Sequence, residues 1–261
     1  MDLKENATSV SDSRRHPWER ARAALLWKML KKEVMQASSY PFRVLDIGSG
    51  DLYQARMLVS KSGEIAVTAL DEAYTEAVRH RLKHDIAGMN IRMIRSPEEI
   101  PGGITFQAVL MMDVIEHVAD DKAFLKQWVA NPSTGRETVF VITVPAYQYL
   151  FSYHDRFLGH FRRYNRKQLV SLCREAGLGV KQSGYLFFPL FLARNLQFLV
   201  HKILRIQKEP GSDLGEWKGP AWVARLIKKV LVVSSCRAMK LSRRGIIVPG
   251  LSAWAVAARN E

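Results

Sequence analysis

The sequence predicts an α/β protein whose parallel β-sheet is covered by helices on both faces. Short, continuously apolar segments alternate along the chain with segments of helical periodicity, and a glycine-rich turn follows the first apolar segment. Continuous apolar runs are typical of strands buried on both faces. With 261 residues, 48% of them hydrophobic, the chain can bury the core of one large domain.

The elements follow from apolar spacing and from turn residues. Residues 1–14 are polar and are expected to form a disordered tail. Pro17 and the helical spacing of Leu26, Leu30 and Val34 predict a helix to about residue 37. Further helices are expected at 54–60, 75–84, 121–130 and 166–176. Strands are expected at 42–47, 65–70, 91–95, 108–112, 138–144, 180–186 and 252–258.

Composition limits the class of protein. Lys and Arg number 39 against 25 Asp and Glu, a formal charge of +14 that favours anionic partners. Two cysteines, Cys173 and Cys236, argue against a disulfide scaffold and a thiolate metal site, and no metal is expected. The first residues lack the apolar stretch of a signal peptide, and no run reaches the roughly 18 apolar residues of a membrane span. We expect a cytoplasmic protein; peripheral attachment to the inner membrane face stays open.

A nucleotide site is expected after the first strand. Gly48-Ser49-Gly50 allows close backbone approach to a ligand, and the following helix offers N–H groups at its start. Asp71 ends the second strand, 21 residues beyond Gly50, where a carboxylate can accept both ribose hydroxyls. These two features alone fit a nicotinamide dinucleotide and S-adenosylmethionine (SAM) equally well.

Two further motifs favour SAM. Asp46 stands two places before Gly48, where a dinucleotide fold would start its glycine pattern, and the fourth strand runs into Met112-Asp113-Val114-Ile115-Glu116-His117-Val118. Over about residues 16–180 this combination resembles class I SAM-dependent methyltransferases, particularly the branch with the ubiquinone O-methyltransferases. The resemblance implies a Rossmann-like seven-stranded sheet whose last strand, 252–258, is antiparallel.

The resemblance also implies the cofactor contacts. The turn from Asp46 to Gly50 would hold the methionine end of SAM, with Arg22 reaching its carboxylate. Asp71 would bind the ribose, Ser96 and Pro97 would flank the adenine, and Met112 would lie beside the cofactor. The residues expected at the cofactor are thus Arg22, Asp46, Gly48, Ser49, Gly50, Asp71, Ser96, Pro97, Met112 and Asp113. Leu52 stands where the family often has a third glycine, so the turn should differ there.

Two clusters are candidates for the acceptor side. The first is the pair Glu116-His117, and the second is the segment from Tyr147 to Tyr164, which is dense in His, Asp and Arg. A histidine beside a carboxylate suits a general base, and arginines can hold a phosphate or carboxylate. The candidate catalytic residues are His117, His154, Asp155, His160 and Arg163. Alternatively, His117 serves structure and the segment is a solvated linker. The segment also resembles one in bacterial SAM methyltransferases encoded near lipid and glycan biosynthesis genes.

Residues 187–244 differ in character from the rest. They hold twelve basic and three acidic residues among many apolar ones, where the implied fold needs only a hairpin. We expect a basic amphipathic helical insert, either lying on an anionic membrane or capping the acceptor site. Residues 15–186 and 245–261 would form the SAM-binding domain.

The leading hypothesis is SAM-dependent methyl transfer to a small or lipid-linked acceptor, at an oxygen. An RNA or DNA methyltransferase is less favoured, because no Asn/Asp-Pro-Pro-aromatic motif follows the fourth strand and no cysteine follows a proline. A non-catalytic SAM-fold protein that docks on anionic lipid or nucleic acid is the third reading. The acceptor and the oligomeric state stay open.

Overall fold

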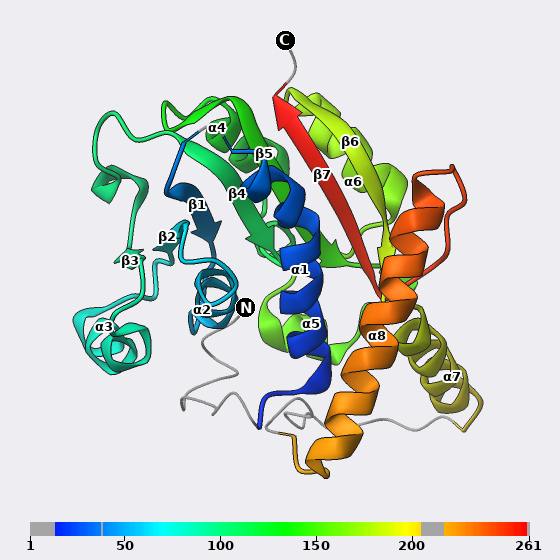
Figure 1. The fold of residues 1–261 in the computed structure, drawn as a ribbon. Helices are drawn as coiled ribbons and strands as arrows, with labels where there is room; N and C mark the ends of the chain where they lie inside the picture. Colours follow the sequence, from blue (N-terminus) through cyan, green and yellow to red (C-terminus); the bar gives the residue numbers. More distant parts are fainter. Residues whose placement is uncertain (1–13, 38, 205–216, 260–261) are drawn as a thin grey trace.

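A seven-stranded sheet forms the centre of the computed structural model, which describes residues 14–37, 39–204 and 217–259 (Figure 1). The strand order is β3-β2-β1-β4-β5-β7-β6. β7 is antiparallel to β5 and β6, and the pairs among β1 to β5 are parallel. The strands are β1 (Phe42–Ile47), β2 (Ile65–Leu70), β3 (Ile91–Ile94), β4 (Phe106–Met112), β5 (Thr134–Pro145), β6 (Leu178–Leu186) and β7 (Ser252–Arg259). The predicted seven-stranded sheet with an antiparallel last strand is confirmed.

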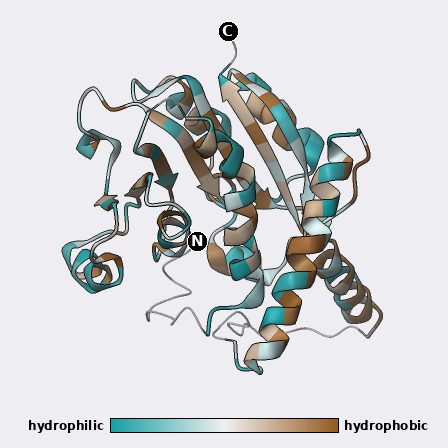
Figure 2. Ribbon diagram, in the orientation of Figure 1, coloured by the Kyte–Doolittle hydropathy of each residue, from teal (hydrophilic) through white to brown (hydrophobic). Residues whose placement is uncertain are grey.

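Helices cover both faces of this sheet. Side chains of α1, α2 and α8 pack on one face, and side chains of α4 and α6 pack on the other. The helices are α1 (Pro17–Met35), α2 (Tyr53–Val59), α3 (Glu76–Lys83), α4 (Asp121–Val129), α5 (Tyr153–Leu158), α6 (Arg166–Glu175), α7 (Phe188–Leu204) and α8 (Ala221–Ser242). Figure 2 shows hydrophobic residues concentrated in the strands and along α7. The predicted tail falls almost wholly on residues 1–13, outside the described residues.

The structure differs from the expected elements at the starts of three strands and in one loop. β4, β5 and β6 begin earlier than predicted, at Phe106, Thr134 and Leu178. The segment predicted as a loop contains α5, whose first turn is closed by a capping box between Ser152 and Asp155. Capping satisfies backbone groups that apolar spacing does not reveal, so the short helix escaped the sequence pattern.

Parallel pairing brings several chain turns to one edge of the sheet. The carboxyl ends of β1, β2, β3 and β4 lie there side by side, and β6 also ends there because it is antiparallel to β7. In open α/β sheets, ligands bind outside the carboxyl ends where neighbouring connections diverge, which here is between β1 and β4. α7 follows β6 directly and therefore starts at the same edge.

Buried ion pairs fix α1 against this edge. Arg15 is 2% exposed, pairs with Asp51 after the glycine turn, and donates to Glu19 at 2.9 Å. Its guanidinium also lies over the Tyr53 ring, 4.0 Å from the ring centre. One turn further along α1, Arg22 pairs with Asp113 at the end of β4. The helix therefore depends on charge pairing as well as on its apolar face.

Replacing Arg15 with alanine should destabilise the fold. The change leaves two buried carboxylates, Asp51 and Glu19, without their cation, which costs about 3–5 kcal/mol in comparable cases. Urea unfolding followed by circular dichroism measures the effect, with the exposed Lys28→Ala on the same helix as the control. Equal stability of the two variants would contradict this role of Arg15.

Candidate cofactor and acceptor site

The turn after β1 is shaped for close backbone packing. Gly48 and Gly50 have φ of +68° and +58°, a region that glycine enters at low cost. A Cβ at Gly48 would lie 2.8 Å from the Val114 side chain, so the position also lacks room for one. The Gly48 N–H donates to the carbonyl of Leu70 at 2.8 Å, which ties the turn to the end of β2.

Asp46 places a carboxylate beneath this turn. The residue is 2% exposed and accepts a hydrogen bond from the Ser49 hydroxyl at 2.7 Å. Burial raises the pKa of Asp46 to about 6, because the charged form is poorly solvated there. A positively charged group bound beside it would lower this pKa and favour the ionised form.

Asp71 lies at the end of β2 and faces the same turn. One carboxylate oxygen accepts from the Gly50 N–H and the other from the Ala73 N–H, each at 3.0 Å. Each oxygen keeps capacity for a further donor, so the group can accept from two neighbouring hydroxyls. The Tyr74 hydroxyl donates to the Gly50 carbonyl at 2.8 Å and holds the turn from below.

Leu52 occupies the position of the absent third glycine. Its φ of +66° lies in the left-handed region that favours glycine, and the residue caps the start of α2. That conformation costs a non-glycine residue about 1–2 kcal/mol. The Leu52 side chain is fully buried with Ala69, Tyr74 and Leu82, which offsets the cost. Burial therefore stabilises a left-handed leucine at this position.

The remaining expected cofactor residues lie along the same edge. Ser96 and Pro97 follow β3, and Pro97 opens a short 3₁₀ turn. Met112 ends β4, followed by Asp113, which accepts from the Thr143 hydroxyl at 3.1 Å. Arg22 meets this group by its ion pair with Asp113. All the residues expected to contact a cofactor therefore lie at the carboxyl ends of β1 to β4 or pair with a residue there.

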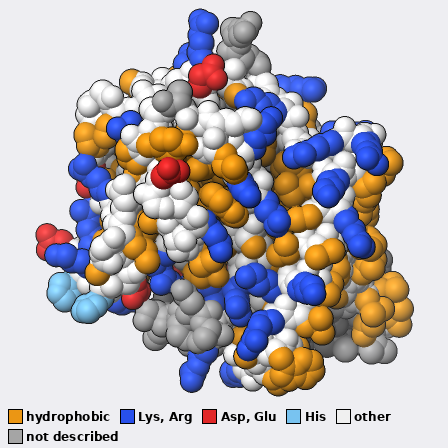
Figure 3. Space-filling model, in the orientation of Figure 1, with side chains coloured by type: hydrophobic (Ala, Val, Ile, Leu, Met, Phe, Trp, Pro, Cys, Tyr) orange, Lys and Arg blue, Asp and Glu red, His pale blue; other side chains and the backbone are white. Residues whose placement is uncertain are grey.

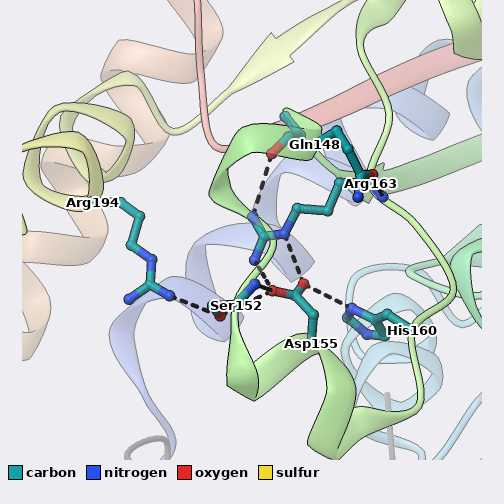
Figure 4. Close-up of polar contacts among 7 residues, drawn as sticks. Gln148, Ser152, Asp155, His160, Arg163 and Arg194 are labelled. Carbon is teal, nitrogen blue, oxygen red and sulfur yellow. Dashed lines mark hydrogen bonds and ion pairs between the residues drawn. The ribbon is translucent and has the colours of Figure 1, made fainter. Parts of the chain in front are cut away.

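Asp155 is the centre of a buried polar network on the neighbouring side (Figure 4). It is 0% exposed and accepts hydrogen bonds from the Ser152 N–H at 2.7 Å and from Arg163 at 2.7 and 3.0 Å. The Nδ1 atom of His160 lies 3.1 Å from the same carboxylate. These partners hold the pKa of Asp155 well below its usual range despite its burial.

This network changes the roles expected for two residues. Arg163 is engaged by Asp155 and donates to the Ala146 carbonyl at 3.3 Å, which leaves it poorly placed to clamp an anion on a substrate. Asp155 stays ionised and orients His160, as a positioning residue would. The segment is therefore not a solvated linker, and Arg194 of α7 joins it through the Ser152 hydroxyl at 3.1 Å.

The three predicted histidines converge near this network. The rings of His117 and His160 meet edge to face with centres 4.5 Å apart. His154 is half-buried on α5, and burial lowers its pKa, which favours the neutral ring. His117 belongs to a short 3₁₀ turn after β4 and not to the start of a longer helix, since α4 begins at Asp121.

Glu116, which the sequence placed in a candidate cluster with His117 but not among the catalytic residues, belongs to this cluster. Its side chain is fully buried, neither carboxylate oxygen has a hydrogen-bond partner, and burial raises its pKa well above the usual range. One ligand atom each from Glu116, His117 and His160 lies within 4.8 Å of the others. Carboxylate and imidazole are suitable ligands for a divalent cation. The direct adjacency of Glu116 and His117 after a strand was the available signal.

The comparisons with known proteins bear on the fold. No family model matches the chain. A ubiquinone biosynthesis O-methyltransferase from Paramagnetospirillum magneticum is 25% identical over 160 residues, covering 56% of this chain and 64% of the relative. The match thus spans less than two thirds of that relative's length.

Solved structures resemble the chain over most of its length. A protein from Galdieria sulphuraria named as a sarcosine dimethylglycine methyltransferase has a TM-score of 0.56 and 16% identity, covering 92% of this chain and 85% of its own. The methyltransferase domain of the bacterial CtHen1-C has a TM-score of 0.54 and 16% identity, covering 93% and 99%.

The chain has the class I SAM-dependent methyltransferase fold. The sequence resemblance to class I SAM-dependent methyltransferases is therefore confirmed for the fold. The [4+2]-cyclase SpnF shares the fold with a TM-score of 0.54 and 14% identity, covering 95% of this chain and 84% of its own. The SAM-methyltransferase fold therefore does not by itself determine the reaction.

Replacing Asp46 with asparagine should change how the stability of this fold depends on pH. An acid whose pKa is higher in the folded state destabilises the fold as pH rises, here between 3.8 and about 6. This difference between the folded and unfolded pKa values corresponds to a loss of about 3 kcal/mol in the free energy of unfolding above pH 6. The neutral asparagine does not ionise and so does not incur this loss. Chemical unfolding at a series of pH values, with the exposed Glu72→Gln as control, measures this. If the free energy of unfolding varied with pH in the same way in the parent and in Asp46→Asn, the raised pKa of Asp46 would be refuted.

Proposed function

We propose that the chain transfers the methyl group of SAM to an oxygen of a small or lipid-like acceptor. The observation that carries the proposal is the arrangement of Asp46, the Gly48–Gly50 turn and Asp71 at the carboxyl ends of β1 and β2. The name of the curated relative specifies O-methyl transfer, which supports an oxygen acceptor.

The residues present fit SAM. Asp46 supplies a buried carboxylate for the amino group of the methionine end, and its hydrogen bond from the Ser49 hydroxyl leaves acceptor capacity for that group. Asp71 keeps acceptor capacity for the ribose hydroxyls. Ser96 and Pro97 would flank the adenine beyond β3. Bound SAM supplies an electrophilic methyl group on a positively charged sulfur.

His160 is the best-placed general base for the acceptor hydroxyl. The ionised Asp155 accepts from Nδ1 of His160, which fixes the tautomer and leaves Nε2 free to take a proton. The proton of the acceptor hydroxyl would pass to that Nε2 atom as the oxygen becomes nucleophilic. Arg163 pairs with Asp155 and keeps it charged, so the carboxylate can hold the His160 ring in this orientation.

A divalent cation is the alternative way to activate the same hydroxyl. Glu116, His117 and His160 would hold it, and the unpartnered buried carboxylate of Glu116 fits such a ligand. The cation would act as a Lewis acid that lowers the pKa of a bound hydroxyl. His160 is a general base in the first arrangement and a metal ligand in the second. Removing divalent cations with a chelator should abolish activity only in the second.

The nucleic-acid alternative has less support. Its main argument is the positive charge, and nine of the fourteen excess charges belong to residues 187–244. In the described part of that segment, basic side chains stand beside large exposed apolar ones, which suits lipid better than a phosphate backbone.

Methyl transfer from SAM should be measured in parallel against extracted lipids, small phenols and RNA. We expect turnover with a phenol or lipid, and a fall in kcat of about 10²- to 10⁴-fold in His160→Ala. His80→Ala, an exposed histidine on α3, is the matched control. Loss of activity on chelation, restored by a divalent cation, would assign His160 as a ligand. Turnover with RNA alone would refute the proposed acceptor class.

A further inference from the structure

Helices α7 and α8 carry a large exposed apolar surface. On α7 the exposed side chains recur at helical spacing, as do those of α8, so each helix presents one apolar stripe. Ile203, Trp222 and Leu196 are 68%, 66% and 64% exposed. We call these side chains and the basic residues among them the α7–α8 surface. Its apolar members are Leu192, Leu196, Phe198, Leu199, Val200, Ile203, Trp222, Leu226, Val230 and Val233.

Basic side chains stand among these apolar ones. Arg225, Lys229, Arg237 and Lys240 are exposed on α8. Residues 187–204 and 217–251 together contain ten Lys and Arg and no Asp or Glu. Figure 3 shows Lys and Arg side chains along α8 next to hydrophobic side chains that gather toward α7. The surface is therefore apolar and positive at once.

The orientation of α8 is fixed by its other side. Leu231, Ala238 and Met239 are buried, and Leu231 and Met239 belong to the core cluster that includes α1. The hydroxyl of the buried Ser235 accepts from the Phe187 N–H at 3.0 Å, which ties the start of α7 to α8. The inner face of α8 packs on the core. Packing within this chain therefore does not explain why the outer face is also apolar.

Two other occupants fit this surface poorly. A second copy in a symmetric dimer would bring the same basic residues toward their own copies, with no acidic residue among the described ones of the two helices to compensate. Nucleic acid would match the charge but would leave the aliphatic stripe of α7 unused.

We propose that the α7–α8 surface docks the protein on an anionic lipid bilayer, with both helices lying in the interface. Apolar side chains would enter the boundary of the acyl chains while Lys and Arg meet the acidic headgroups. Among the described residues, no helix has the length and hydrophobicity needed to cross the bilayer. This inference goes beyond methyl transfer and does not depend on it.

The surface is continuous with the acceptor side. The Tyr149 hydroxyl donates to the Asn195 side chain of α7 at 2.7 Å, and the Tyr149 ring packs against Phe198 with centres 6.0 Å apart. Arg194 of α7 reaches Ser152, which also contacts Asp155. Docking would therefore bring the bilayer beside the network around His160.

Co-sedimentation with vesicles tests the inference in the full chain. Binding is expected to phosphatidylcholine vesicles that contain phosphatidylglycerol and to weaken with salt. Arg225→Gln and Lys229→Gln should each reduce the partition coefficient about fivefold. Leu196→Ser with Ile203→Ser should reduce it further, because apolar burial is lost. The controls are Lys28→Gln and Met35→Ser, exposed positions on α1, which should leave binding unchanged.

Several results would overturn the inference. These are no binding to anionic vesicles at low salt, equal binding to pure phosphatidylcholine, or equal losses in the α1 controls. A lipid-free dimer that Leu196→Ser dissociates would assign the surface to a second copy, and competition by RNA that abolishes vesicle binding would assign it to nucleic acid. Circular dichroism of each variant confirms that lost binding is not lost folding.

Discussion

The candidate site depends on the parallel pairing of β1 with β2 and β4. Those pairings put the turn after Ile47, the carboxylate of Asp71 and the Asp113 segment at one edge, although they are separated by tens of residues in the chain. Gly48 is then confined between the end of β2 and Val114, where a side chain has no room. The relative positions of the glycine turn, Asp71 and Asp113 follow from this register.

The buried carboxylates at this edge of the sheet are of two kinds. Asp155 is surrounded by donors and a guanidinium, so it stays ionised and can orient His160 permanently. Asp46 and Glu116 are buried with few or no partners, and their pKa values are raised. Buried acids left in that condition are costly, and such groups are candidates for ligand binding. This contrast underlies the proposal that Asp155 positions His160 and that Asp46 and Glu116 face bound ligands.

The sequence predicted the sheet and the cofactor edge well, because continuous apolar strands and turn residues are local signals. It did not predict α5, whose start depends on the capping box of Ser152 and Asp155. Nor did it predict that Arg163 is engaged by Asp155, since a tertiary ion pair leaves no periodicity in the chain. Leu52 was recognised as a departure, but its left-handed backbone and buried packing required the surrounding residues. Glu116 was named only as the neighbour of His117, because its lack of hydrogen-bond partners is visible only in three dimensions.

Calorimetric titration with SAM is the decisive measurement for the proposed cofactor site. We expect saturable binding at one site, about 10- to 100-fold weaker in Asp71→Ala because charge-assisted hydrogen bonds to the ribose are lost. The neighbouring exposed Glu72→Ala should bind as the parent does. Absence of SAM binding by the folded parent, or equal affinity in Asp71→Ala, would contradict the account.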